Sequence, residues 1–127
     1  MTAHGHFHWN ELMTRDAEKA KDFYGKTLGW TYHEMSMMEG MSYWVCMDGE
    51  QPIGGIFTMN GPHFEGVPEH WFPYIAVDDI DARLEKLKAE GGQVTREPFD
   101  MPGVGRIAIV TDSNGAPSGW MTPAEQG

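Results

Sequence analysis

The sequence predicts an α+β protein built from two tandem βαβββ modules, and three observations support this prediction. First, the stretch from Leu12 to Trp30 has a counterpart 63 positions later, so that Leu12 falls on Ile75 and Asp16 on Asp79. Second, each copy has the pattern of a strand end, an N-capped helix and a glycine exit. Third, strand-like runs separated by turns follow both helices. An internal repeat of roughly sixty residues indicates two half-domain units.

The first module is predicted to run from about residue 6 to about residue 60. Its first strand covers residues 6–14, and alternation places Leu12 on the helix side with Trp9, Glu11 and Met13 on the opposite side. The helix begins after a capping Asp16 and leaves through a glycine. Three further strands are expected at residues 30–37, 41–48 and 52–60.

A linker over about residues 60–69 separates the second module, which is predicted at about 70–123. Its helix covers residues 79–90, and its strands cover 70–78, 93–99, 105–112 and 116–123. At 127 residues, the two modules are expected to share one core as a single domain over residues 1–127. The side chains expected among the buried residues are Leu12, Phe23, Leu28, Ile75, Leu84 and Leu87.

Composition limits the classes of partner. The chain has 19 acidic and 9 basic residues, a formal net charge of −10, and no cluster of Lys or Arg that would bind phosphates. Nucleic acid is therefore not expected as a partner, and the acidity serves either solubility or the attraction of a cationic ligand. No apolar run resembles a signal peptide or a membrane span, so no membrane partner is expected and the predicted location is cytoplasmic. Cys46, the single cysteine, lies in an apolar run, which favours a buried inert thiol over a nucleophile.

Several segments together resemble the glyoxalase, bleomycin-resistance and extradiol-dioxygenase superfamily, the vicinal oxygen chelate fold. The resemblance is carried by ELMTRD and KAKDFYGKTLGW in the first module, and by YIAVDDIDARLEKLKAEGG, GVGRIAIVTDSNGA and WMTP in the second. It implies that the two modules form a cup-shaped mixed sheet, that a small organic molecule binds in the cup, and that the protein is a homodimer.

The resemblance also bears on metal binding. Metal-dependent members of the superfamily commonly place a His or Gln on the first strand of each module and a Glu on the last strand. The matching positions here are Trp9 and Phe72 on the first strands, with Gly119 and a position near Gly55 on the last. Because rings and glycines cannot replace these ligands, the usual metal and other cofactors are not expected. The large rings opposite small glycines predict a pocket with flat apolar walls and room beside the last strands.

Three features could support catalysis, and each has a simpler alternative. The alternating His4, His6 and His8 could chelate a metal or form a solvated terminal cluster. Glu11 could act as a general base with a raised pKa, or it could be a rim carboxylate or a partner of Arg106. Arg106 could hold a ligand carboxylate or simply be solvated.

We therefore expect a protein that binds a small apolar or aromatic molecule, including a cationic one, without the usual metal. The alternative is a metal-dependent glyoxalase-like lyase, isomerase or dioxygenase with rearranged ligands, in which Glu11 is the candidate catalytic residue. Whether the protein is an enzyme stays open from the sequence. The residues predicted to bind the ligand are Trp9, Glu11, Gly55, Phe57, Phe72, Tyr74, Arg106, Gly119 and Met121.

Overall fold

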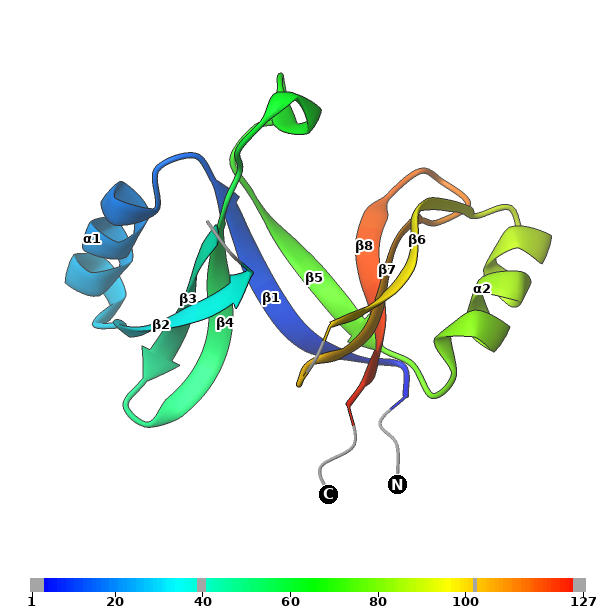
Figure 1. Ribbon diagram of the computed structural model, residues 1–127, viewed down its shortest axis with the longest axis horizontal. Helices are drawn as coiled ribbons and strands as arrows, with labels where there is room; N and C mark the ends of the chain where they lie inside the picture. The colour runs from blue at the N-terminus through cyan, green and yellow to red at the C-terminus, as the bar shows by residue number, and fades with distance from the viewer. Residues whose placement is uncertain (1–3, 39–40, 102, 125–127) are drawn as a thin grey trace. The chain divides into compact units, whose positions relative to one another are not determined.

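The computed structural model describes residues 4–38, 41–101 and 103–124. The chain divides into two compact units: a first unit of residues 9–72, and a second unit of residues 1–8 together with 73–127. Each unit contains a helix and a sheet, and in each the helix covers one side of the sheet (Figure 1). We call that side the helix face and the other side the opposite face.

The first module has the predicted order of strand, helix and three strands. Its sheet has the strand order β2-β3-β4-β1, in which β1 and β4 are parallel and the other neighbours are antiparallel. The elements are β1 (His6–Thr14), α1 (Ala17–Leu28), β2 (Thr31–Met38), β3 (Met41–Asp48) and β4 (Gln51–Thr58).

The second module repeats this order after a linker that contains the short 3-10 helix η1 (Pro62–Phe64). Its sheet has the order β5-β8-β7-β6, again with the first and last strands of the module, β5 and β8, parallel. The elements are β5 (His70–Ala76), α2 (Ile80–Ala89), β6 (Gln93–Met101), β7 (Gly105–Thr111) and β8 (Pro117–Pro123). The predicted α+β class with two βαβββ modules is confirmed.

The ends of both helices have the predicted chemistry. The side chain of Asp16 accepts a hydrogen bond from the backbone N–H of Lys19 at 3.0 Å, and Asp79 caps α2 in the same way. At the other ends, Gly29 has a φ of 78° and Gly91 a φ of 93°, conformations that glycine adopts without strain. The repeat therefore marks equivalent helix starts, since Ala17 and Ile80 are 63 positions apart. The helix ends differ, because α2 ends at Ala89, two positions before the counterpart of Leu28.

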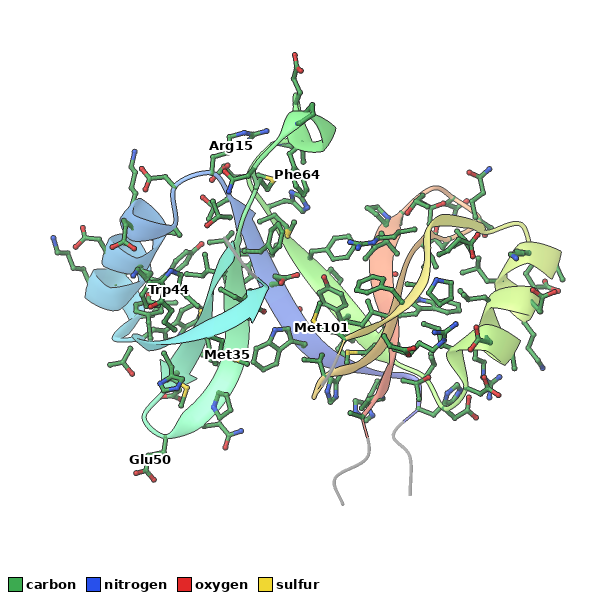
Figure 2. The ribbon with its side chains drawn as sticks, viewed as in Figure 1. Arg15, Met35, Trp44, Glu50, Phe64 and Met101 are labelled. Carbon is green, nitrogen blue, oxygen red and sulfur yellow. The ribbon has the colours of Figure 1, made fainter. Side chains whose placement is uncertain are left out.

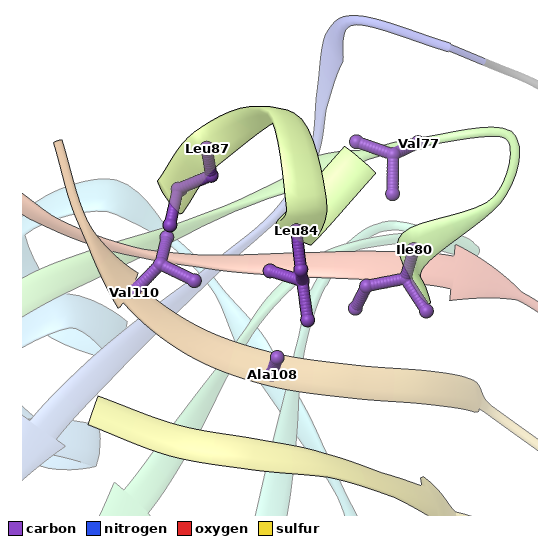
Figure 3. Packing of buried hydrophobic residues seen from close by; sticks show 6 residues of the cluster. All are labelled: Val77, Ile80, Leu84, Leu87, Ala108 and Val110. Carbon is purple, nitrogen blue, oxygen red and sulfur yellow. The ribbon is translucent and has the colours of Figure 1, made fainter. Parts of the chain in front are cut away.

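In the second module, the helix-face core contains six buried residues (Figure 3): Val77, Ile80, Leu84, Leu87, Ala108 and Val110. Leu84 and Leu87 are buried as predicted, and Val77 confirms which face of β5 lies under the helix. Ile75 is only half-buried, so its predicted burial is wrong. It lies instead beside an open pocket that Leu87 and Trp120 also line.

In the first module, Leu12, Ala17, Cys46 and Ile56 form the buried helix-face core, so the predicted side of Leu12 is confirmed. Phe23 and Leu28 were expected in this core, and that prediction is wrong, since each is 57% exposed. Lys21 takes an inner position instead, with its ammonium 3.1 Å from the ring centroid of Trp44.

The helices within the described ranges are too short or too polar to cross a membrane.

The two modules offer a matched pair of leucines for testing the helix placement. Leu87 is 7% exposed in the α2 core, whereas Leu28 is 57% exposed at the end of α1. We expect Leu87→Ala to lower the free energy of unfolding by about 2–5 kcal/mol, because it leaves a cavity. Leu28→Ala should cost no more than about 0.5 kcal/mol. Urea unfolding of both variants measures this, and equal losses would contradict the assigned faces.

Candidate functional site

The candidate site begins on β1, whose two faces have different surroundings. Glu11 is only 8% exposed and its neighbour Leu12 only 6% exposed, although successive side chains of a strand point to opposite faces. Leu12 packs in the α1 core, so Glu11 is buried on the opposite face together with the half-buried Trp9. A carboxylate in such a position needs polar partners.

One such partner is Tyr43, which comes from β3. The indole Nε1–H of Trp9 donates a hydrogen bond of 2.8 Å to the Tyr43 hydroxyl oxygen. The Tyr43 side chain is buried, and its hydroxyl is also hydrogen-bonded to Glu11. Three residues from two strands therefore form one connected polar group on the opposite face of the first unit.

Burial and charge decide the protonation of Tyr43. Burial raises the pKa of Tyr43 far above its usual range, and the negative charge of Glu11 raises it further, while the hydrogen bond from Trp9 acts in the other direction. The phenol is therefore neutral at physiological pH. It accepts from the indole and donates its proton to the carboxylate, which orders the group as Trp9, Tyr43 and Glu11.

Gly55 on β4 makes room for the Tyr43 ring. A Cβ atom at this position would lie 1.8 Å from the Tyr43 hydroxyl oxygen and 2.3 Å from Cζ, so no larger residue fits while Tyr43 stays in place. Gly55 is also paired directly with Glu11 in the β1–β4 register. The open room that we expected beside Gly55 is thus filled by Tyr43.

The linker covers another part of the same face. The rings of Phe57 on β4 and Phe64 in η1 have centroids 5.9 Å apart. The linker is tied to the end of β1 by Glu69, which accepts a hydrogen bond from the backbone N–H of Arg15 at 3.0 Å and another from the Thr14 hydroxyl. The Arg15 guanidinium donates to the Phe64 carbonyl, and these two residues lie together at the linker (Figure 2).

In the second unit, Gly119 on β8 is also covered by a tyrosine. A Cβ atom there would lie 2.2 Å from Cδ1 of Tyr74, which is the residue paired with Gly119 in the β5–β8 register. The room expected beside Gly119 is therefore filled as well. Met121 is 3% exposed and is paired with Ile107, which is also buried.

Arg106 is about one-third exposed and forms ion pairs within its own unit, while the ligand-carboxylate role expected for it stays a prediction. Its guanidinium makes a bidentate contact to Asp81 of α2, at 3.0 and 3.2 Å, and a further contact to Asp100 at 3.3 Å. Hydrogen bonds to Asp81 and then to Asp100 raise the pKa of Arg106. Arg106 therefore has ion-pair partners within its own unit on the helix face.

The histidines near the start of the chain do not converge on one point. The Nδ1 atom of His4 is 3.2 Å from the backbone N–H of Asp78, and the ring centroids of His6 and His8 are 6.4 Å apart. Within residues 4–38, 41–101 and 103–124, no three His, Cys, Asp or Glu side chains are grouped as metal ligands. Cys46 is fully buried, and burial raises its thiol pKa to about 11, as befits an unreactive side chain.

The predicted site residues fall in both units. Trp9, Glu11, Gly55, Phe57 and Phe72 belong to the first unit; Tyr74, Arg106, Gly119 and Met121 belong to the second. The structure brings Trp9, Glu11 and Gly55 together around Tyr43, a residue that was not predicted from the sequence. The sequence signal for Tyr43 was weak, because placing this residue requires the register of β3 on β4, where a bulge at Cys46 and Met47 breaks the alternation.

The chain belongs to the Glyoxalase/Bleomycin resistance protein/Dioxygenase superfamily, whose family model matches residues 5–117. "Putative glyoxylase CFP32" of Mycobacterium tuberculosis is 42% identical over 118 residues, which are 93% of this chain and 44% of that protein. "Anthracycline biosynthesis protein DnrV" of Streptomyces peucetius is 28% identical over 119 residues, covering 85% of this chain and 43% of that protein. The chain therefore spans less than half the length of these curated relatives.

Solved structures agree on the fold. A hypothetical protein from Bacillus halodurans has a TM-score of 0.74 at 16% identity, with 96% of both chains covered. The methylmalonyl-CoA epimerase of Streptomyces coelicolor, in complex with 2-nitronate-propionyl-CoA, has a TM-score of 0.70 at 16% identity, with 97% of this chain and 100% of that chain covered. Identity this low shows a shared fold and no more.

The fit of Tyr43 over Gly55 is tested by a double-mutant cycle. We expect Gly55→Ala alone to lower the free energy of unfolding by about 1–3 kcal/mol, because the new methyl group displaces the Tyr43 ring. In a Tyr43→Ala background, the same change should cost at least about 1 kcal/mol less. Gly25→Ala is the control, since its Cβ would have no neighbour closer than 3.6 Å. Additive effects at residues 43 and 55 would show that the two do not share this space.

Proposed function

We propose that the protein binds a small aromatic molecule that carries a cationic or hydrogen-bond-donating group, without the usual divalent metal. The observation that carries this proposal is the buried carboxylate of Glu11, held by a neutral Tyr43 among aromatic rings. The ligand would lie on the opposite face of the first unit, where Trp9 and Phe57 offer apolar surface. Glu11 would then be the group that selects the charge of the ligand.

Chemistry supports a cationic or donating ligand. A ligand ammonium or N–H group that reaches the Glu11 carboxylate would form a strong charge-assisted hydrogen bond, in addition to the bond that Tyr43 makes with it. Indole and phenyl faces also attract cations. The formal net charge of −10 favours the approach of a cation in the same way.

The names of the relatives support small-molecule binding in general. They include a glyoxylase, an anthracycline biosynthesis protein and an epimerase bound to a CoA derivative, which differ in the molecules they imply. The binding of a small organic ligand is the feature that these names have in common, and we propose only that feature for this chain. The ligand-binding role predicted for Phe72, the homodimer and the cytoplasmic location are parts of the same proposal. The roles predicted for Tyr74, Arg106, Gly119 and Met121, which belong to the second unit, stay predictions.

The residues at the positions of the usual metal ligands do not fit a divalent ion. The resemblance assigns those positions to Trp9, Phe72, Gly119 and the neighbourhood of Gly55, and none of these offers a side-chain donor that binds such an ion. At Gly55 the space for a longer side chain is taken by Tyr43. No step of the proposed function is therefore assigned to a metal.

A second candidate function is proton transfer to or from a bound substrate, as in a lyase or isomerase. It is favoured by the position of Glu11, a buried carboxylate in hydrogen-bond contact with a neutral phenol. In such a pair the carboxylate has the chemistry of a general base, and the phenol donates a hydrogen bond that positions it. In both candidates Glu11 is the residue that meets the ligand.

The proposal is tested with phenethylamine as a cationic aromatic probe and 2-phenylethanol as its neutral counterpart. We expect the amine to bind and to shift the indole N–H signal of Trp9 in NMR spectra. Glu11→Gln should weaken amine binding about tenfold and weaken alcohol binding less, because the amide oxygen still accepts a hydrogen bond but carries no charge. Glu50→Gln, at an exposed turn, is the matched control. Equal binding of the amine to wild type and Glu11→Gln would contradict the role of Glu11.

A further inference from the structure

The helix face of the first unit contains a pocket that is separate from the group around Glu11. Its volume is about 310 Å³, and it is lined by Asn10, Trp30, Ile53, Gly54 and Trp71. All five residues belong to residues 9–72. A volume of this size accommodates one or two rings.

Trp71 forms an exposed but firmly held wall of this pocket. It is 39% exposed, yet its indole Nε1–H donates to the Tyr24 hydroxyl at 3.2 Å. Its ring also meets Tyr24 and Trp30 edge-on, with centroids 5.6 and 6.1 Å away. Trp30 is in turn stacked on Tyr24 at 5.2 Å. An indole fixed in this way loses little side-chain entropy when a ligand binds.

The floor of the pocket is bare backbone. A Cβ atom at Gly54 would lie 2.8 Å from the backbone oxygen of Asn10, so the two strands approach as closely as a glycine allows. Ile53 continues the apolar surface beside it. Trp30 and Trp71 stand at 90° to each other, so a flat molecule can stack on one ring and meet the edge of the other.

Asn10 supplies the polar group. Its side chain is exposed, and its amide makes no hydrogen bond to the residues that the structure describes. Alternation along β1 places it on the same face as Leu12, which is the face of the pocket. An amide offers a donor and an acceptor side by side, so it matches a ligand edge with the same pair.

The geometry points to a second ligand site here, for a planar, uncharged aromatic heterocycle that presents a neighbouring hydrogen-bond donor and acceptor, as a lactam does. The ligand is uncharged because none of the five lining residues carries a charge to compensate an ion. The site lies on the helix face and does not depend on Glu11. It therefore stands or falls independently of the proposed function.

The test uses 2-quinolone, a two-ring lactam, and the ¹⁵N-labelled protein. The chain has five tryptophans, so five indole N–H signals report on it, and Trp→Phe variants assign them. We expect 2-quinolone to shift the signals of Trp30 and Trp71 in a saturable way, with a Kd of about 0.1–1 mM for a ligand of this size. The Trp9 signal should not move, because it reports on the other face.

Variants then measure separately how much the Trp71 ring and the Asn10 amide contribute to binding. Trp71→Ala should weaken binding at least about tenfold, and Asn10→Ala about tenfold, while Asn60→Ala at another exposed position stays within about twofold. N-Methyl-2-quinolone, which lacks the donor, should bind about as weakly to wild type as 2-quinolone does to Asn10→Ala. Unchanged signals of the remaining tryptophans show that a variant is folded, and Trp71→Phe replaces Trp71→Ala if the latter unfolds.

Several results would overturn the inference. One is the absence of saturable shifts at Trp30 and Trp71 up to about 5 mM 2-quinolone, well above the expected Kd. Another is a shift of the Trp9 indole signal while the signals of Trp30 and Trp71 stay unchanged. Equal affinities of the Asn10→Ala and Asn60→Ala variants would remove the amide from the site and with it the predicted class of ligand.

Discussion

The alternation of side chains along β1 is the constraint on which the rest of the first unit depends. Glu11 and Leu12 are neighbours in sequence, and both are buried, but on opposite faces of the sheet. Leu12 joins the core under α1, and Glu11 meets Tyr43. A slip of one residue would place the carboxylate under the helix and expose the leucine, so the packing of the core also fixes the chemistry of the other face.

The two modules have the same order of strands and helix, but the tyrosine that covers the last-strand glycine comes from a different strand in each. Each has a glycine on its last strand, and in each that glycine is covered by a tyrosine ring. In the first module the ring of Tyr43 comes from β3 and reaches Glu11, whereas in the second Tyr74 stands directly opposite Gly119 on β5. The first arrangement joins a buried carboxylate to a phenol and an indole, and its tyrosine comes from a different strand than in the second, so the repeat does not make the two sites equivalent.

The sequence was sufficient to predict the elements, because their signals are local. The capping residues Asp16 and Asp79 and the exits at Gly29 and Gly91 act within one helical turn, and they appear in the structure where expected. Side-chain burial was harder to predict. Leu28 continues the apolar stripe of α1, but it is the last residue of the helix and its side chain remains exposed. Hydrophobic spacing identifies a helix face but not how far the sheet extends beneath it.

The candidate site was predicted only in part, for a similar reason. Trp9 and Glu11 followed from alternation in one strand, whereas Tyr43 depends on the pairing of two other strands across a bulge. The ion pair of Arg106 was not predicted, because its partner Asp81 lies 25 positions earlier, on α2. Contacts between distant parts of the chain are decided by packing and not by local pattern.

We propose that the hydrogen-bonded group of Trp9, Tyr43 and Glu11 stands where metal-dependent members of the superfamily place their ligands. The most direct measurement is the melting temperature of protein purified without a histidine tag, with and without zinc, nickel, manganese or iron, together with its metal content. We expect no stoichiometric metal and no rise in melting temperature, since ligation would stabilise the fold by mass action. A clear rise on adding one of these metals, abolished by Glu11→Gln or His8→Ala, would contradict it.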